Sequence, residues 1–348
     1  MKTPSSMTSR NPKSQRTAPS VEKSLAILAL FILGIVAIGS FISVLGVQYL
    51  AEDSSLLYKG EAKFARRVMM ICALLFAPLL FLWFRIQWPA DASWKPAEGY
   101  KPNKPWWNFF LQGLVLGLFT MGILLALSLV MGTRFVDIDK RGWDLALRFF
   151  TYGAGACFIA VFEETLSRGF LFRAIGRRVG IWTAIILTSA LFAGAHFLTP
   201  SDLAFQTQGS LAERTLSVFS SCFTTGPKES QKILYFLNLS MMGILLCLLT
   251  LRTGTIWMAA GTHAGWVWVK KMNSILADRT SKADAETLIE RRLDPGHFEW
   301  LIGGRSDHAD SLVTLLLLSV LAYAVYQSIR QSQQNQGGKE DGNRVFPI

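Results

Sequence analysis

Apolar residues gather in long runs along this chain, and most runs are long enough to cross a bilayer. A membrane-spanning helix needs about 20 mainly apolar residues. Six runs approach or exceed that length: 24–50, 68–88, 107–131, 181–198, 233–251 and 311–326. Two further runs, 145–160 and 255–269, are interrupted by polar residues. The pattern predicts an all-α, polytopic integral membrane protein with about eight transmembrane helices, and seven or nine are alternatives.

Polar sequence is concentrated in the two tails and the loops. Residues 1–23 form a basic tail predicted to be disordered, 24–329 the membrane domain, and 330–348 a second polar tail. The first apolar run is too long for a signal-peptide core and lacks a small-residue cleavage site, so we expect a retained anchor. An even number of spans puts both termini on one side. The basic first tail favours the cytoplasmic side, and we expect a bacterial cytoplasmic membrane.

Composition supports this assignment and narrows the possible partners. Hydrophobic residues make up 51% of the 348, above the usual share in soluble proteins. The net charge of +11 is spread over tails and loops, so nucleic acid is not an expected partner. We expect contact with membrane lipids and with a membrane-associated protein or peptide substrate. The four cysteines show no CxxC spacing, which argues against a disulfide framework and a cysteine zinc site.

Ionisable residues are rare inside the predicted spans. Burying such a group costs several kcal/mol unless it is paired, so each is a candidate for function. Glu163, Glu164 and Arg168 lie at the fourth span, His196 in the fifth and His263 in the seventh. The predicted active-site residues therefore lie on a helical core of spans four, five and seven.

Helical spacing gives the two glutamates different surroundings. Glu164 and Arg168 are four residues apart with the acid first, so they lie on one face and form a favourable pair. Glu163 is turned away by about 100°. Leu166 and Ser167, three and four residues beyond Glu163, carry no positive charge. The spacing predicts that Glu164 is structural and that Glu163 is available for chemistry.

Hairpin geometry brings two histidines to the level of Glu163. If the fourth and fifth helices turn at 179–180, Glu163 and His196 both lie about 25 Å from the turn. His263 lies about 14 Å beyond its own turn at Gly254, so the depths agree if the first hairpin protrudes by about two helical turns. Alanine and glycine surround each histidine, in SALFAGAH and AAGTHAG, and allow close helix packing. One carboxylate and two imidazoles are therefore predicted to converge.

A glutamate with two histidines supports two peptidase chemistries. In one, Glu163 and a histidine activate water for attack on a peptide carbonyl, and another polar group stabilises the oxyanion. In the other, Glu163, His196 and His263 hold a zinc ion whose bound water is the nucleophile. The sequence contains neither HExxH nor GxSxG, so neither a zincin helix nor a serine nucleophile elbow is expected.

Two short motifs resemble those of the CPBP family of intramembrane proteases. That family is related to the CAAX prenyl endopeptidases and includes bacteriocin-processing and immunity proteins. EETLSR at 163–168 fits the family pattern EExxxR and FAGAH at 192–196 fits FxxxH, within a family-like core of about 145–270. The resemblance implies that Glu163 and His196 activate water. It also implies that Glu164, Arg168 and Phe192 support the site.

The third family motif, HxxxN or HxxxD, is matched only at its histidine. In HAGWV, His263 is followed four positions later by Val267, which neither donates a hydrogen bond nor binds metal. The resemblance implies that His263 assists in oxyanion stabilisation or metal binding. Loss of one oxyanion donor lowers the rate by about a hundredfold or more. Thr262 and Trp266 are candidates to replace the missing group, Trp266 through its indole N–H.

Two functions from different classes follow from these residues. One is an intramembrane endopeptidase that hydrolyses a peptide bond of a membrane-associated or lipidated protein or peptide. The alternative is a catalytically impaired relative that binds a peptide or partner helix, as an immunity-type protein would. A proton-coupled transporter is disfavoured because the sequence shows no inverted repeat or pair of broken helices.

Overall fold

The computed structural model describes residues 21–50, 60–87, 105–130, 142–224, 230–276 and 311–337, and every regular element within these ranges is helical. The elements are α1 (Val21–Tyr49), α2 (Glu61–Gln87), α3 (Trp106–Val130), α4 (Trp143–Glu164), the π-helix η2 (Thr165–Leu171), α5 (Phe172–Val179), α6 (Ile181–Ala195), the 3₁₀-helix η3 (Asp202–Gln206), α7 (Leu211–Thr224), α8 (Ser230–Thr253), α9 (Trp257–Leu276) and α12 (Leu312–Gly337). The predicted all-α class is confirmed.

Five helical stretches are long and apolar enough to cross a membrane. They are Leu25–Tyr49, Trp106–Leu127, Trp143–Leu171, Ile233–Thr253 and Leu312–Ser332, and Ile181–Ala195 is a shorter apolar helix. Helices α2 and α9 coincide with the predicted spans 68–88 and 255–269 but are not among the five. The fold is that of a polytopic membrane protein, while the predicted count of about eight spans is not confirmed.

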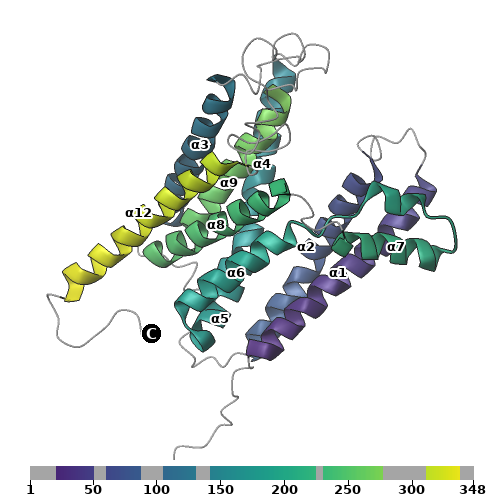
Figure 1. The fold of residues 1–348 in the computed structure, drawn as a ribbon, viewed down its shortest axis with the longest axis horizontal. Coiled ribbons are helices and arrows are strands. Elements are labelled where there is room, and N and C mark those ends of the chain that lie inside the picture. Colours follow the sequence, from purple (N-terminus) through teal and green to yellow (C-terminus); the bar gives the residue numbers. More distant parts are fainter. Residues whose placement is uncertain are drawn as a thin grey trace, which may run out of the picture.

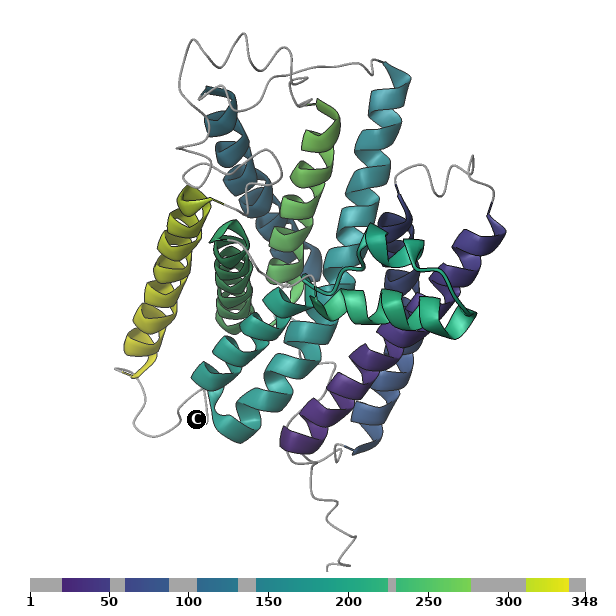
Figure 2. The ribbon, with the colours of Figure 1, turned by 45° about the vertical axis from the view of Figure 1, so that its right-hand side comes forward.

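Two helices, α8 and α9, lie inside the bundle, and the surrounding helices pack against them. Helices α3 and α4 pack against α9, and α6 and α12 pack against α8; the turned view shows this order (Figure 2). Leu246 and Leu249 of α8 are fully buried in the largest apolar cluster, to which α5, α6, α9 and α12 also contribute. Helices α1 and α2 pair with each other beside this bundle, and α7 packs across α1 (Figure 1). His263 therefore belongs to an interior helix.

Helices α4, η2 and α5 follow one another without a break from residue 143 to 179. The run ends at Gly180, whose φ of 88° lies in the left-handed region that glycine adopts readily. Helix α6 begins at the next residue and returns antiparallel to it. The turn predicted at 179–180 is confirmed.

The segment after His196 is fastened to the α1–α2 pair. The Ala62 N–H at the start of α2 donates to Oδ1 of Asp202 in η3 at 2.8 Å, which satisfies one of the free amides of a helix N-terminus. Burial and the nearby Asp202 carboxylate raise the pKa of Glu61, and Arg214 of α7 opposes them. Helix α7 packs on α1 through Val218, which contacts Val44 within one buried cluster.

The helices at both ends extend beyond the predicted membrane domain. Helix α1 begins at Val21 instead of residue 24, and α12 continues to Gly337, inside the predicted polar tail 330–348. Glutamine and arginine in that stretch have good helix propensity, so polarity there does not end the helix. The remaining tail residues, 1–20 and 338–348, lie outside the described residues.

Candidate active site

The predicted site residues lie where α4, α6 and α9 approach one another. Glu163 and Glu164 are the last residues of α4, and Arg168 lies in the π-helix η2 that follows. His196 is the C-cap of α6, and His263 lies in the second turn of α9. The structure thus brings residues 99 positions apart into direct contact, since Glu164 and His263 are hydrogen-bonded.

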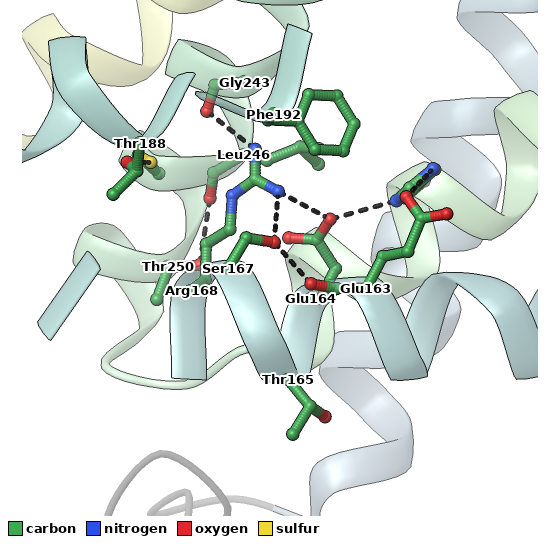
Figure 3. A network of polar contacts seen from close by, with 12 residues as sticks. Glu163, Glu164, Thr165, Ser167, Arg168, Thr188, Phe192, Gly243, Leu246 and Thr250 are labelled. Carbon is green, nitrogen blue, oxygen red and sulfur yellow. Dashed lines mark hydrogen bonds and ion pairs between the residues drawn. The ribbon is translucent and has the colours of Figure 1, made fainter. Parts of the chain in front are cut away.

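Glu164 and Arg168 form the ion pair predicted from their spacing. Arg168 Nη1 donates to Oε1 of Glu164 at 2.9 Å, and both side chains are fully buried. The guanidinium also donates to Ser167 Oγ at 2.9 Å and to the Gly243 carbonyl of α8 at 3.1 Å (Figure 3). Its Cζ lies 4.7 Å from the centre of the Phe192 ring. A buried charge needs such a set of partners, so this pair has a structural role.

His263 lies between the two carboxylates. Its Nδ1 lies 2.9 Å from Oε1 of Glu164, and its Nε2 lies 3.9 Å from Oε2 of Glu163. Glu163 is 34% exposed, whereas Glu164 is 0% exposed. The two glutamates thus lie in different surroundings. The Glu164 carboxylate is enclosed and paired with Arg168, and the Glu163 carboxylate is accessible beside the His263 imidazole.

His196 is oriented by its own helix. Its Nδ1 lies 2.9 Å from the Phe192 carbonyl oxygen, and because a carbonyl only accepts, Nδ1 carries the proton. The other ring nitrogen, Nε2, is then the basic one when the imidazole is neutral. The ring interacts electrostatically with Glu163 and His263. The Phe192 ring, which the Arg168 guanidinium covers, also packs on both histidines, with its centre 4.8 Å from that of His196 and 5.8 Å from that of His263.

A π-helical segment begins directly after the two glutamates. Within η2 the backbone bonds i to i+5, a rare geometry that is frequent at functional sites. The Ser167 hydroxyl donates to the Glu163 carbonyl oxygen, and Thr165 Oγ1 donates to the Val161 carbonyl at 2.7 Å. The sequence stretch EETLSRGFL carries no proline or glycine pair that would predict this change.

The hairpin of α5 and α6 protrudes beyond the hairpin of α8 and α9, as the sequence predicted. Arg173 of α5 donates through Nη2 to the carbonyl of Gly254, at the turn between α8 and α9, at 3.2 Å. Gly180 lies seven residues, or about 10 Å of helix, beyond Arg173, so the α5–α6 turn extends past the α8–α9 turn. This offset of about two helical turns aligns His263 with Glu163.

Helix α9 is held against α3 by glycine contacts. The glycines are Gly113 and Gly117 of α3 and Gly261 and Gly265 of α9. A Cβ on Gly117 would lie 2.2 Å from the Thr262 carbonyl oxygen, and one on Gly261 would lie 2.0 Å from that of Phe110. Two of the four glycines flank His263 in sequence. The small residues around His263 were predicted from the sequence to allow close packing, but their partners in α3 were not, although GLVLG at 113–117 repeats the small-xxx-small pattern.

The two groups expected to replace the missing third-motif donor have other partners. The Trp266 indole N–H donates to Thr120 Oγ1 of α3 at 2.8 Å, in a buried contact. The Thr262 hydroxyl donates to the Met258 carbonyl of its own helix at 2.9 Å. Trp266 therefore links α9 to α3, and the expectation that it presents its N–H to the site is corrected. Thr120 was not singled out from the sequence, because a threonine in an apolar helix carries no signal of its own.

The predicted metal ligands are Glu163, His196 and His263. Both histidines have Nδ1 hydrogen-bonded, which leaves Nε2 as the ring donor in each. In the described part of the chain, however, no group of three or more His, Cys, Asp or Glu is arranged to hold a metal ion. Zinc binding by Glu163, His196 and His263 therefore stays a prediction, and we derive no catalytic step through zinc.

One comparison with known proteins matched this region. Residues 145–269 match the family model described as "Type II CAAX prenyl endopeptidase Rce1-like". The matched segment runs from near the start of α4 through η2, α5, α6, η3, α7 and α8 into α9, so it includes all of the predicted site residues. No curated protein and no solved structure matched the chain.

Proposed function

We propose that the chain, whose residues 145–269 match a CAAX endopeptidase family model, is an intramembrane endopeptidase that hydrolyses a peptide bond in a membrane-associated or lipidated protein or peptide. The observation that carries the proposal is the pairing of an accessible Glu163 with the Nε2 of His263, beside a Glu164 that Arg168 neutralises. A carboxylate that is accessible and has no basic partner on its own helix is suited to accept a proton from water.

The proposed reaction uses Glu163 as the general base. Glu163 takes a proton from a water molecule as the water oxygen attacks the peptide carbonyl carbon. The carbonyl electron pair moves to its oxygen and forms a tetrahedral oxyanion. As the C–N bond breaks, that pair returns to form the new carboxyl group, and the proton passes from Glu163 to the leaving amine. Water is added across the bond, so atoms and charges balance.

The two histidines are proposed to orient and polarise the reacting groups. His263 is fixed by Glu164 through Nδ1, so its Nε2 faces Glu163. His196 is fixed through Nδ1 by the Phe192 carbonyl, and its Nε2 is proposed to share the attacking water with Glu163. A histidine whose second nitrogen is hydrogen-bonded has a defined tautomer and ring orientation, which favours proton transfer in one direction.

A second function is favoured by one observation. Val267 stands where the family motif has an amide or acid, and Trp266 and Thr262 are bonded elsewhere. A chain without an oxyanion donor would bind a peptide in the same place without cleaving it rapidly. The competing proposal is therefore a catalytically impaired, peptide-binding or immunity-type protein.

The family name suggests which substrate to test first. The purified chain is reconstituted into vesicles and supplied with a peptide ending in a farnesylated CaaX sequence, in which a lipidated cysteine precedes two aliphatic residues and a terminal residue. The unprenylated peptide tests whether the lipid is needed. The variants are Glu163→Gln and His196→Gln, and Glu213→Gln, in the exposed segment of α7, is the matched control.

We expect cleavage by the wild type and by Glu213→Gln, and a loss of about 10²- to 10⁴-fold in Glu163→Gln. Mass spectrometry of the products identifies the bond that is cut. Equal product from wild type and Glu163→Gln would reject the protease. Binding of the peptide without cleavage in all variants would support the impaired, peptide-binding protein.

A further inference from the structure

The helix that carries His263 also carries a lysine on the same face. Residues four and seven positions apart are separated by about 40° and about −20° around an α-helix. His263, Val267 and Lys270 therefore share one face of α9. His263 is buried and Lys270 is exposed, so the face runs from the interior of the site to its accessible side.

Helix geometry favours a Lys270 side chain that extends back toward His263. Cα–Cβ bonds in a helix tilt toward the N-terminus, so a long side chain covers the preceding turn. Lys270 and His263 are separated by about 10 Å of helical rise, and the four-carbon stem of lysine extends over about half of this. An extended Lys270 side chain would place its ammonium over the turn occupied by Val267, where the family motif has its polar group.

An electrostatic interaction places the Lys270 ammonium near the site. Lys270 interacts with His196, which belongs to α6 and is separated from it by 74 positions in sequence. The same imidazole interacts with Glu163 and His263. The Lys270 charge therefore acts on the same imidazole as these two site residues.

The neighbouring lysine is directed elsewhere, which makes the assignment specific. Lys271 interacts electrostatically with Tyr152, and its Nζ lies 3.4 Å from the position that a Cβ on Gly155 would occupy. Both residues belong to α4. Gly155 precedes Glu163 by eight residues, or about 12 Å of helix. Lys271 therefore packs against α4 away from the site.

We propose that the Lys270 ammonium binds the oxyanion formed on the substrate carbonyl, in place of the amide or acid that Val267 replaces. This inference rests on the proposed peptidase function. An ammonium carries three N–H donors on a flexible stem, so it reaches an anion from one helical turn away. Its positive charge also favours the negative oxyanion over the neutral substrate carbonyl, which is the condition for acceleration instead of mere binding.

The first experiment measures cleavage of the farnesylated CaaX peptide by four variants. Lys270→Met keeps the stem and removes the charge, and Lys271→Met is the matched control. We expect kcat to fall by about a hundredfold in Lys270→Met with KM unchanged, because the contact exists only in the transition state. Val267→Asn restores the family donor. The kcat of Val267→Asn/Lys270→Met should therefore be at least tenfold higher than that of Lys270→Met. A rise in KM alone, or equal losses in the two lysine variants, would overturn the proposal.

A second measurement does not depend on turnover. A peptide analogue with a phosphinate at the scissile position carries the anionic, tetrahedral group, and its neutral ketone analogue does not. We expect the wild type and Lys271→Met to bind the phosphinate at least tenfold more tightly than the ketone, and Lys270→Met to lose this preference. If the wild type cleaves nothing but shows this Lys270-dependent preference, the protease is rejected and the anion site stands. If the preference is unchanged in Lys270→Met, the anion site is rejected whether or not the peptide is cleaved.

Discussion

His263 contacts Glu164 through Nδ1 at 2.9 Å and faces Glu163 through Nε2 at 3.9 Å. One imidazole thus joins the enclosed carboxylate to the accessible one, although the two glutamates are adjacent in sequence. Because Arg168 shares the same Glu164 oxygen, the charge that neutralises Glu164 and the ring that faces Glu163 are parts of a single network.

Removal of the Glu164 charge is expected to destabilise the fold more than removal of the Glu163 charge. Glu164→Gln leaves Arg168 buried without its counter-ion, which costs about 3–5 kcal/mol. Glu163→Gln changes a side chain that is 34% exposed and should leave the unfolding midpoint nearly unchanged. Thermal unfolding in detergent measures both. Glu164→Gln/Arg168→Met should regain part of the lost stability, because replacing a whole buried pair is often neutral. Similar midpoints for the two single variants would refute the structural role of Glu164.

The pairing of Glu164, and not Glu163, with Arg168 was predictable from spacing alone, because an i, i+4 pair depends only on helical geometry. The depth of His196 and His263 was predictable for the same reason, once the turns at Gly180 and Gly254 were identified. Neither prediction depends on which other helices pack nearby. The predicted depths agree with the contact between Arg173 and Gly254.

The partners of α9 were not predictable in this way. Trp266 has a donor that suits either an oxyanion or a neighbouring helix, and only the position of α3 decides between them. The change from α-helix to π-helix at Thr165 coincides with the segment in which Arg168 bonds to Gly243 of α8. Local propensity carries no information on either feature.

The contact between α3 and α9 should not tolerate a methyl group at Gly117. A Cβ there would lie 2.2 Å from the backbone oxygen of Thr262, so the helices must separate and His263 must shift. We expect Gly117→Ala to lower the unfolding midpoint and the cleavage rate. Gly122→Ala is the matched control on the same helix, because its Cβ would meet nothing within 4 Å. It should be neutral or slightly stabilising, since alanine has the better helix propensity. Equal behaviour of the two variants would contradict the close contact.

The Thr120 hydroxyl should contribute to stability through Trp266. Thr120→Val keeps the shape but removes the acceptor of the buried indole N–H, and an unsatisfied buried donor costs about 1–3 kcal/mol. Thr151→Val is the control, because the Thr151 hydroxyl is exposed and bonds only to carbonyls of α4. Chemical denaturation should show a lower unfolding free energy for Thr120→Val alone. A second readout is tryptophan fluorescence, which should shift only if the Trp266 environment changes.

Chelation is expected to leave the rate of peptide cleavage unchanged. The described residues present no group of three or more metal-binding side chains in a suitable arrangement, and the proposed base is a carboxylate. Purified protein is incubated with a strong chelator, and cleavage and metal content are measured on the same sample. Loss of activity that is restored by added zinc would show that Glu163, His196 and His263 close around a metal ion and would overturn the metal-free reaction.

Helix α3 lies entirely outside the matched segment 145–269. A fragment cut at the borders of that segment would retain every motif residue but would lose the surface on which α9 rests. Gly261 and Gly265 of α9 would lose their contacts with α3. The Trp266 N–H would lose the Thr120 hydroxyl oxygen that accepts its hydrogen bond. The matched segment is thus smaller than the set of helices that hold His263, and a fragment that keeps the contact between α3 and α9 must also include Trp106–Val130.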